Sequence, residues 1–190
     1  MRYLIRQAKL IPFLFLIPIT IAGLLTENYD MIKQHGSEIT LTDFATAKAF
    51  LNFGAISAGI SCILLALGVF LNFKRYHLSS VLLIIFGISM ISNGLYPMGS
   101  PMHGLYGIGL SFMLLPFVAC YELKNELISN RFFPISVFAG VVVFIYFWAM
   151  LVGLDPANYR GLTQRIACVF IFGWIAYFGF ELNRKLEYYQ

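Results

Sequence analysis

Residues 47–72 read AKAFLNFGAISAGISCILLALGVFLN, and this stretch decides the fold class. It exceeds the roughly 20 apolar residues that an α-helix needs to cross a bilayer. Its only charged side chain, Lys48, lies near its start. Gly54, Ala58 and Cys62 recur at intervals of four, so they share a face on which another helix can approach closely. The stretch therefore predicts a membrane-spanning helix that packs against others.

Five further apolar stretches resemble it, so we predict an all-α polytopic bundle of six transmembrane helices. Six spans of about 20 residues leave room only for short loops, so residues 1–190 form a single domain. Hydrophobic residues make up 59% of the chain and charged residues 12%, about half the charge of a soluble protein. The predicted spans are about 10–25, 47–72, 80–96, 101–121, 133–154 and 162–180, and residues 26–46 form the largest outer loop.

The N-terminal segment has the features of a secretory signal, with Arg2, Arg6 and Lys9 ahead of an apolar run. The run contains Pro12 and Pro18 and ends without a small-x-small cleavage site. We therefore interpret it as a retained first span.

The distribution of positive charge predicts the orientation of the bundle. Nine Lys and Arg residues fall on the side of the termini and four on the opposite side, which places both termini in the cytoplasm. The absence of an Asn-x-Ser/Thr sequon favours a prokaryotic inner membrane. The nine are residues 2, 6, 9, 74, 75, 124, 131, 184 and 185, and the four are 33, 48, 160 and 165.

Small residues indicate where the helices pack. Gly104, Gly107 and Ser111 form one stripe in the fourth span, and Ser136 and Gly140 lie in the fifth. We therefore expect a Leu at Gly107 to destabilise the bundle more than a Leu at Gly140. The central parts of the spans contain no charged residue, which disfavours a proton pump, an ion-coupled transporter or an active site at the midplane.

A polar cluster is predicted at the outer ends of the third, fourth and sixth spans. Ser100 is a favoured helix N-cap and Pro101 a favoured first residue, so His103 is expected in the first turn of the fourth span. The helix dipole would keep His103 neutral there, and the free N–H groups would attract an anion. Asn93 and Tyr96 close the preceding span.

The fifth loop supplies the rest of the predicted cluster. Asp155, Asn158 and Arg160 are close in sequence, and Arg165 follows at the membrane boundary. Arg165 could pair with Asp155 or Asp43, bind a lipid phosphate, or join other residues in a structural cap that holds the loops together. The candidate ligand-binding residues are Asn93, Tyr96, His103, Asp155, Asn158, Arg160 and Arg165.

No metal site or cofactor is predicted. His35 and His103 are expected outside and His77 inside, so the chain cannot place three His ligands on one face. Ser92 or Ser100 beside His103 lacks a surrounding nucleophile motif. The net charge of +4 reflects orientation rather than nucleic-acid binding, because no basic stripe is interleaved with aromatic residues.

The stretch from Asn93 to Gly104, NGLYPMGSPMHG, resembles a motif of a prokaryotic family of six-span proteins, domain of unknown function 998. In that family an aromatic-Pro pair closes the third span and a His-small pair opens the fourth. The resemblance covers essentially the whole chain and makes Tyr96, Pro97 and His103 the motif positions. The family is similar in layout to the Frag/DRAM/Sfk group, which is tied to lipid handling, and it implies no settled activity.

These features predict a non-enzymatic membrane protein whose outer pocket binds a lipid headgroup or small amphiphile. The alternative is a lipid-modifying enzyme in which His103 is the general base and Asp155 orients it. A second alternative is a facilitator or channel for a neutral solute. Membrane lipids are the expected partners, nucleic acid is not, and the sequence leaves a homo-oligomer open.

Overall fold

The computed structural model describes residues 2–73, 76–124 and 129–188, and within them the chain is helical with no strand. The prediction of an all-α polytopic bundle is confirmed. The elements are α1 Tyr3–Arg6, η1 Gln7–Leu10, α2 Ile11–Leu24, η2 Gly36–Leu41, α3 Ala45–Asn72, α4 His77–Leu95, η3 Ile108–Leu114, α5 Leu115–Leu123, α6 Phe132–Leu151 and α7 Arg160–Tyr188.

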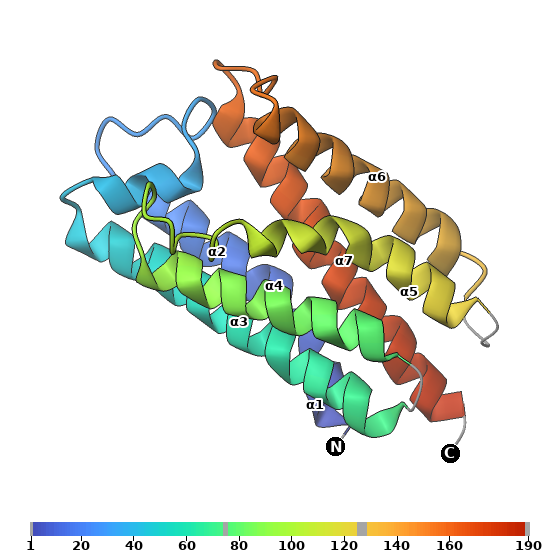
Figure 1. Ribbon diagram of the computed structural model, residues 1–190. Helices are drawn as coiled ribbons and strands as arrows, with labels where there is room; N and C mark the ends of the chain where they lie inside the picture. Colours follow the sequence, from blue (N-terminus) through green and yellow to red (C-terminus); the bar gives the residue numbers. More distant parts are fainter. Residues whose placement is uncertain (1, 74–75, 125–128, 189–190) are drawn as a thin grey trace.

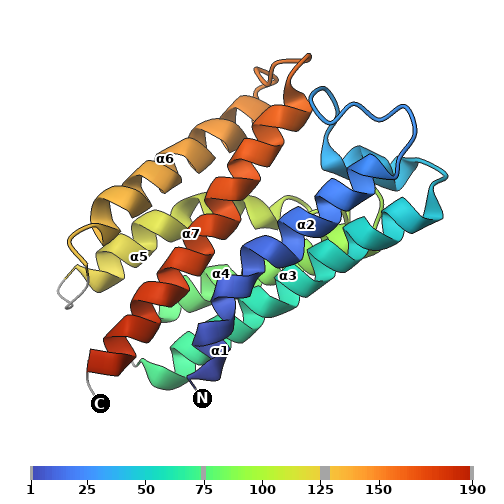
Figure 2. The same cartoon turned by 180° about the vertical axis from the view of Figure 1, so that it is seen from behind.

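The helices form a closed ring in which neighbours in sequence are neighbours in space (Figure 1). Helix α3 packs between α2 and α4, and α4 packs on η3 and α5. Helix α6 packs against α5 on one side and α7 on the other, and α7 packs against α2, which closes the ring. The view from behind shows α7 and α2 side by side (Figure 2). Short connections favour this arrangement, because consecutive antiparallel helices pack with little loop between them.

The helices have the dimensions of an integral membrane protein. Within the part of the chain that the structure describes, five helices are long and apolar enough to cross a bilayer: Tyr3–Leu24, Ala45–Asn72, His77–Leu95, Phe132–Leu151 and Arg160–Tyr188. The sixth apolar segment, Ile108–Leu123, is shorter. Both termini lie at the same end of the bundle, as an even number of crossings requires (Figure 1). Which end is cytoplasmic stays a prediction, and Lys74 and Arg75, which contribute to it, lie outside the described residues.

The fourth segment differs from the predicted span 101–121. Residues 101–107 form turns, and helical structure begins only at Ile108, first as η3 and then as α5. Gly104, Leu105, Tyr106 and Gly107 all have positive φ, which an α-helix excludes. Ser100 and Pro101 therefore do not start a helix. The expectations that His103 lies in a first helical turn and that free helix N–H groups form an anion site there were wrong.

Two helix backbones approach each other closely at a seam between α3 and α4, at Gly59 and Gly87. A Cβ on Gly59 would lie 2.5 Å from the Gly87 carbonyl oxygen, and a Cβ on Gly87 would lie 2.7 Å from the Gly59 carbonyl oxygen. Farther along, a Cβ on Gly94 would lie 2.9 Å from the Asn52 carbonyl oxygen. These glycines let the two helices touch, as small residues do in membrane bundles. Gly54, predicted to pack, meets Pro18 of α2.

Gly107 does not lie on the predicted helical packing stripe, and the predicted order of destabilisation by Leu at Gly107 and Gly140 stays a prediction. Gly107 belongs to a turn with φ of +81°, and a Cβ there would meet only Leu110, at 3.7 Å. At Gly140 a Cβ would lie 2.8 Å from the ring of Phe117 on α5. Gly140 is therefore the packing glycine, and Gly107 serves the backbone conformation instead.

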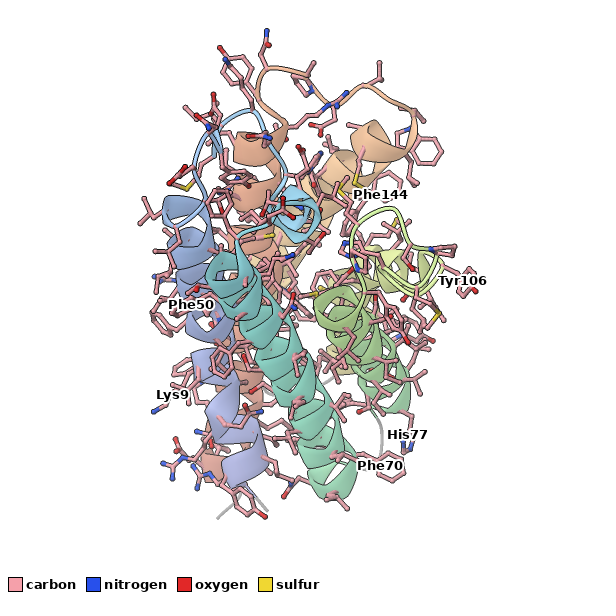
Figure 3. The ribbon with its side chains drawn as sticks, turned by 90° about the vertical axis from the view of Figure 1, so that its left-hand side faces the viewer. Lys9, Phe50, Phe70, His77, Tyr106 and Phe144 are labelled. Atoms are coloured by element: carbon pink, nitrogen blue, oxygen red, sulfur yellow. The ribbon has the colours of Figure 1, made fainter. Side chains whose placement is uncertain are left out.

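Charged side chains are buried at the end that carries the termini. Helix α7 continues past the predicted end of the sixth span, and Glu181 and Lys185 are buried in its last turns. Glu122 of α5 accepts hydrogen bonds from the Leu78 and Ser79 backbone N–H groups and so caps the start of α4. Figure 3 shows Phe70 and His77 beside each other at this end, where their ring centroids are 5.3 Å apart.

Candidate functional site

A cavity of about 450 Å³ opens inside the ring at the end opposite the termini. Each of the six segments of the ring contributes to its wall. Its size is within the range of pockets that hold small organic ligands. The lining residues from α2, α3, α6 and α7 are mostly apolar, and they include Ile19, Leu51, Ala55, Phe147, Met150, Cys168 and Ile171.

Three aromatic rings form the floor of the cavity near the middle of the bundle. Phe15 of α2 packs on Phe172 of α7 with ring centroids 4.3 Å apart, and Phe86 of α4 lies 6.0 Å from Phe172. The fully buried Phe112 packs against Phe86 in a tilted arrangement, and Trp174 packs edge-on against Phe112. The cavity is therefore a blind pocket with an apolar floor.

The mouth of the cavity carries polar side chains, none of them Lys, Arg, Asp or Glu. They come from the 25–44 loop, from the end of α4, from the 96–107 turns and from the start of α7. The cavity as a whole is therefore amphipathic, because apolar groups lie deep and hydrogen-bonding groups lie near the loops. The polar residues are His35, Ser37, Asn93, His103 and Gln164.

His103 and Asn93, two of the predicted ligand-binding residues, line the cavity. His103 is held by its Nδ1, which lies 2.9 Å from the Tyr96 carbonyl oxygen. Tyr96 thus contributes its backbone, while its side chain is exposed. Ser92 and Ser89 of α4 donate hydrogen bonds to the carbonyls of Met102 and Gly104, which fixes the turns around His103.

Asp155 pairs with His35 rather than with His103. Its Oδ2 lies 3.4 Å from His35 Nε2, and its side chain is only 8% exposed. The Thr163 hydroxyl donates to Oδ1 at 2.8 Å. Asp155 therefore does not orient His103, and the predicted His103–Asp155 pair is absent. The structure instead forms a histidine–carboxylate pair whose histidine lines the cavity.

Arg165 is engaged by the protein and does not reach the cavity. Its Nη1 donates to the carbonyl oxygens of Met31 at 2.7 Å and Gly161 at 2.9 Å, and its Nη2 donates to the Tyr29 hydroxyl at 2.9 Å. These bonds fasten the 25–44 loop to the first turn of α7. Of the alternatives that the sequence left open, this is the structural cap.

The remaining two predicted ligand residues are also outside the cavity. Asn158 and Arg160 are exposed in and after the loop that precedes α7, and neither contributes to the lining. Of the predicted set, Asn93 and His103 line the cavity. Tyr96 contacts His103, and Asp155 contacts His35. The other three residues, Asn158, Arg160 and Arg165, lie outside the lining.

The 25–44 loop is ordered by local electrostatics. Backbone N–H groups of Ile32 and Lys33 donate to Asp30 and lower the pKa of its carboxyl group. Burial raises the pKa of the Tyr29 phenol, and the Arg165 guanidinium partly offsets that rise. The loop also caps α7, since the Leu162 N–H donates to the Ile32 carbonyl at 3.0 Å.

Most lining residues were not predicted as site residues, among them His35, Tyr146, Gln164 and Cys168. For α7 the sequence contains a pattern that could have identified its lining residues, because they follow the spacing of a single helix face. They are Gln164, Cys168, Ile171 and Phe172. His35 lies in a loop, where periodicity gives no information. Among the described residues no group of three His, Cys, Asp or Glu side chains is placed to hold a metal ion.

The comparison with known families agrees with the sequence resemblance. The model of the family described as "Protein of unknown function (DUF998)" matches residues 10–181, so the chain belongs to this family. No curated protein and no solved structure matches the chain. The similarity in layout to the Frag/DRAM/Sfk group stays a prediction.

Proposed function

We propose that this member of the family binds a lipid or small amphiphile in the cavity and carries out no chemistry on it. The observation that carries the proposal is the gradient along the cavity, from a floor of three aromatic rings to a mouth of hydrogen-bonding groups. An amphiphile has the same gradient, and binding pockets typically combine apolar walls with a few polar groups that fix orientation.

The volume favours a ligand with a single chain. A cavity of about 450 Å³ holds a molecule of drug size rather than a phospholipid with two acyl chains. The blind aromatic floor disfavours a channel for neutral solutes, since a continuous polar path through the ring is what such a channel needs.

Cys168 provides a native probe of occupancy. Of the three free cysteines, it alone lines the cavity, while Cys62 is buried on α3 and Cys120 lies on α5. In a variant that keeps only Cys168, N-ethylmaleimide should react slowly with protein as purified and faster after delipidation. Added oleic acid, monoolein or oleoyl lysophosphatidic acid should slow the reaction again.

A variant that keeps only Cys120 is the matched control, because a ligand in the cavity should not protect it. If none of the three oleoyl compounds changes the labelling of Cys168, the proposed function is wrong. If protection appears at both cysteines, the compounds act on the whole bundle rather than in the cavity.

A second function is favoured by one observation, the pairing of His35 with buried Asp155. The carboxylate lies 3.4 Å from the imidazole without a hydrogen bond, and a closer approach would give the arrangement of a general base in a lipid-modifying enzyme. Release of oleate from monoolein by the wild type, lost in His35→Gln, would establish this function. Recovery of intact monoolein from the wild type would exclude it for this substrate.

A further inference from the structure

The charge of the cavity lining restricts which amphiphile it accepts. Among the described residues, no Lys, Arg, Asp or Glu side chain lines it. Arg165, the cation nearest in sequence to Gln164, donates to backbone carbonyls of the 25–44 loop and of α7 instead. An anionic head would therefore enter without a cationic partner, and burying an unpaired charge costs several kcal/mol.

The pair formed by His35 and Asp155 increases this discrimination against anions. Asp155 is 8% exposed and lies 3.4 Å from His35. If His35 is neutral, the pair carries a negative charge that repels an anion. If His35 is protonated, its charge is already matched by Asp155, so it offers little to a second anion.

His103 lines the cavity, and its contact with Tyr96 decides which ring nitrogen can accept a hydrogen bond. Its Nδ1 lies 2.9 Å from the Tyr96 carbonyl oxygen, which can only accept, so Nδ1 carries the proton. In a neutral imidazole the other nitrogen, Nε2, is then an acceptor. No described protein group occupies Nε2, so it is available to an O–H or N–H donor of a ligand.

Gln164, in contrast, offers hydrogen-bond donors. Its Oε1 accepts the Gly36 N–H at 2.7 Å, which leaves the two Nε2 hydrogens as donors. Asn93 adds an amide whose nitrogen contacts only the weakly accepting sulfur of Met90, at 3.9 Å. The mouth thus offers an acceptor on one side and a donor on the other.

We propose that the cavity selects a single-chain amphiphile with an uncharged hydroxyl head, which donates to His103 Nε2 and accepts from the Gln164 amide. A monoacylglycerol or a long-chain alcohol has this chemistry. A fatty acid anion, a lysophosphatidic acid and a fatty acid methyl ester each lack either neutrality or the donor. This inference rests on the proposed function of amphiphile binding.

A panel with one acyl chain and four heads tests the selectivity. Monoolein, oleate, oleoyl lysophosphatidic acid and methyl oleate are compared by the concentration that half-protects Cys168 from N-ethylmaleimide, at an alkaline pH that ionises the fatty acid. Monoolein should protect at the lowest concentration. Methyl oleate should require roughly three- to tenfold more, the equivalent of one hydrogen bond, and the two anions more again.

Two substitutions at His103 test whether its Nε2 accepts the hydrogen bond from the ligand. His103→Asn places an amide where Nδ1 was, so it keeps the donor to Tyr96 and removes the acceptor from the cavity. His103→Gln extends to the position of Nε2 and keeps an acceptor there. Monoolein binding should weaken roughly three- to tenfold in His103→Asn and stay near the wild-type value in His103→Gln. Methyl oleate should bind both variants as it binds the wild type.

The outcomes separate this inference from the proposed function. Protection of Cys168 by oleate or lysophosphatidic acid at concentrations equal to or below that of monoolein overturns the neutral-head inference and leaves amphiphile binding intact. An equal loss of monoolein binding and methyl oleate binding in His103→Asn also overturns the inference. The histidine would then shape the cavity without forming a hydrogen bond to the hydroxyl head. Failure of all four compounds overturns both.

Discussion

The seam between α3 and α4 and the end of the ring opposite the termini, which is the predicted outer end, are held together in different ways. At the seam Gly59 and Gly87 bring two backbones into contact, and no space remains. At the outer end, turns around Gly104 and Gly107 and the 25–44 loop cover the ring, and a cavity of about 450 Å³ remains. Glycine gives close packing in the first region and positive φ in the second. The number of small residues in a segment therefore does not distinguish a packing interface from the cover of a pocket.

The largest effect is expected from a bulky residue in the seam. Gly87→Leu should destabilise the protein by about 3 kcal/mol or more, since even a Cβ would lie 2.7 Å from the Gly59 carbonyl oxygen and the helices must separate. Gly173→Leu is the control, because a Cβ there meets nothing within 4 Å, and it should stay within about 0.5 kcal/mol of the wild type. Thermal unfolding in detergent measures both. Similar melting temperatures for the two variants would mean that the seam is not a tight contact.

The next largest effect is expected where the loop is tied to α7. Arg165→Gln should cost about 2–3 kcal/mol, since the guanidinium donates to the carbonyls of Met31 and Gly161 and to the Tyr29 hydroxyl. Arg160→Gln removes an exposed charge five residues earlier and should change stability by less than about 0.5 kcal/mol. The same melting experiment compares the pair. A ligand-binding role for Arg165 would require the reverse, a stable Arg165→Gln variant that has lost its lipid.

The smallest effect is a dependence on alkaline pH. Burial raises the pKa of Tyr29 above its ordinary value of 10.0, so the folded state favours the protonated phenol. The stabilisation is complete below pH 10 and is lost as the pH rises through the folded pKa. The wild type should therefore be more stable than Tyr29→Phe at neutral pH, and the difference should shrink above pH 10. A difference that is constant across this range would show that Tyr29 titrates as an exposed tyrosine does.

The sequence predicted the helices well because hydrophobicity over about 20 residues is a strong signal, and residues 47–72 lie within α3 as the structure has it. The outer end was predicted less well. Ser100 and Pro101 are typical of a helix start, yet Leu105 and Tyr106 have positive φ. The hydroxyls of Ser89 and Ser92 on α4 donate to carbonyls of these turns, and local preference does not include such contacts. The sequence placed His103 and Asp155 in one cluster, but the partner of Asp155 is His35, which is distant in sequence.

The central claim is that an amphiphile occupies the cavity, and filling the cavity tests it most directly. Cys168→Trp places a large side chain in the lining, whereas Val169→Trp adds the same side chain at the next residue of α7, where the wild-type side chain is 54% exposed. Native mass spectrometry of the three detergent-purified proteins should show a bound single-chain lipid on the wild type and on Val169→Trp, and none on Cys168→Trp. The same lipid on all three proteins, with melting temperatures unchanged, would contradict the assignment of the cavity as the binding site.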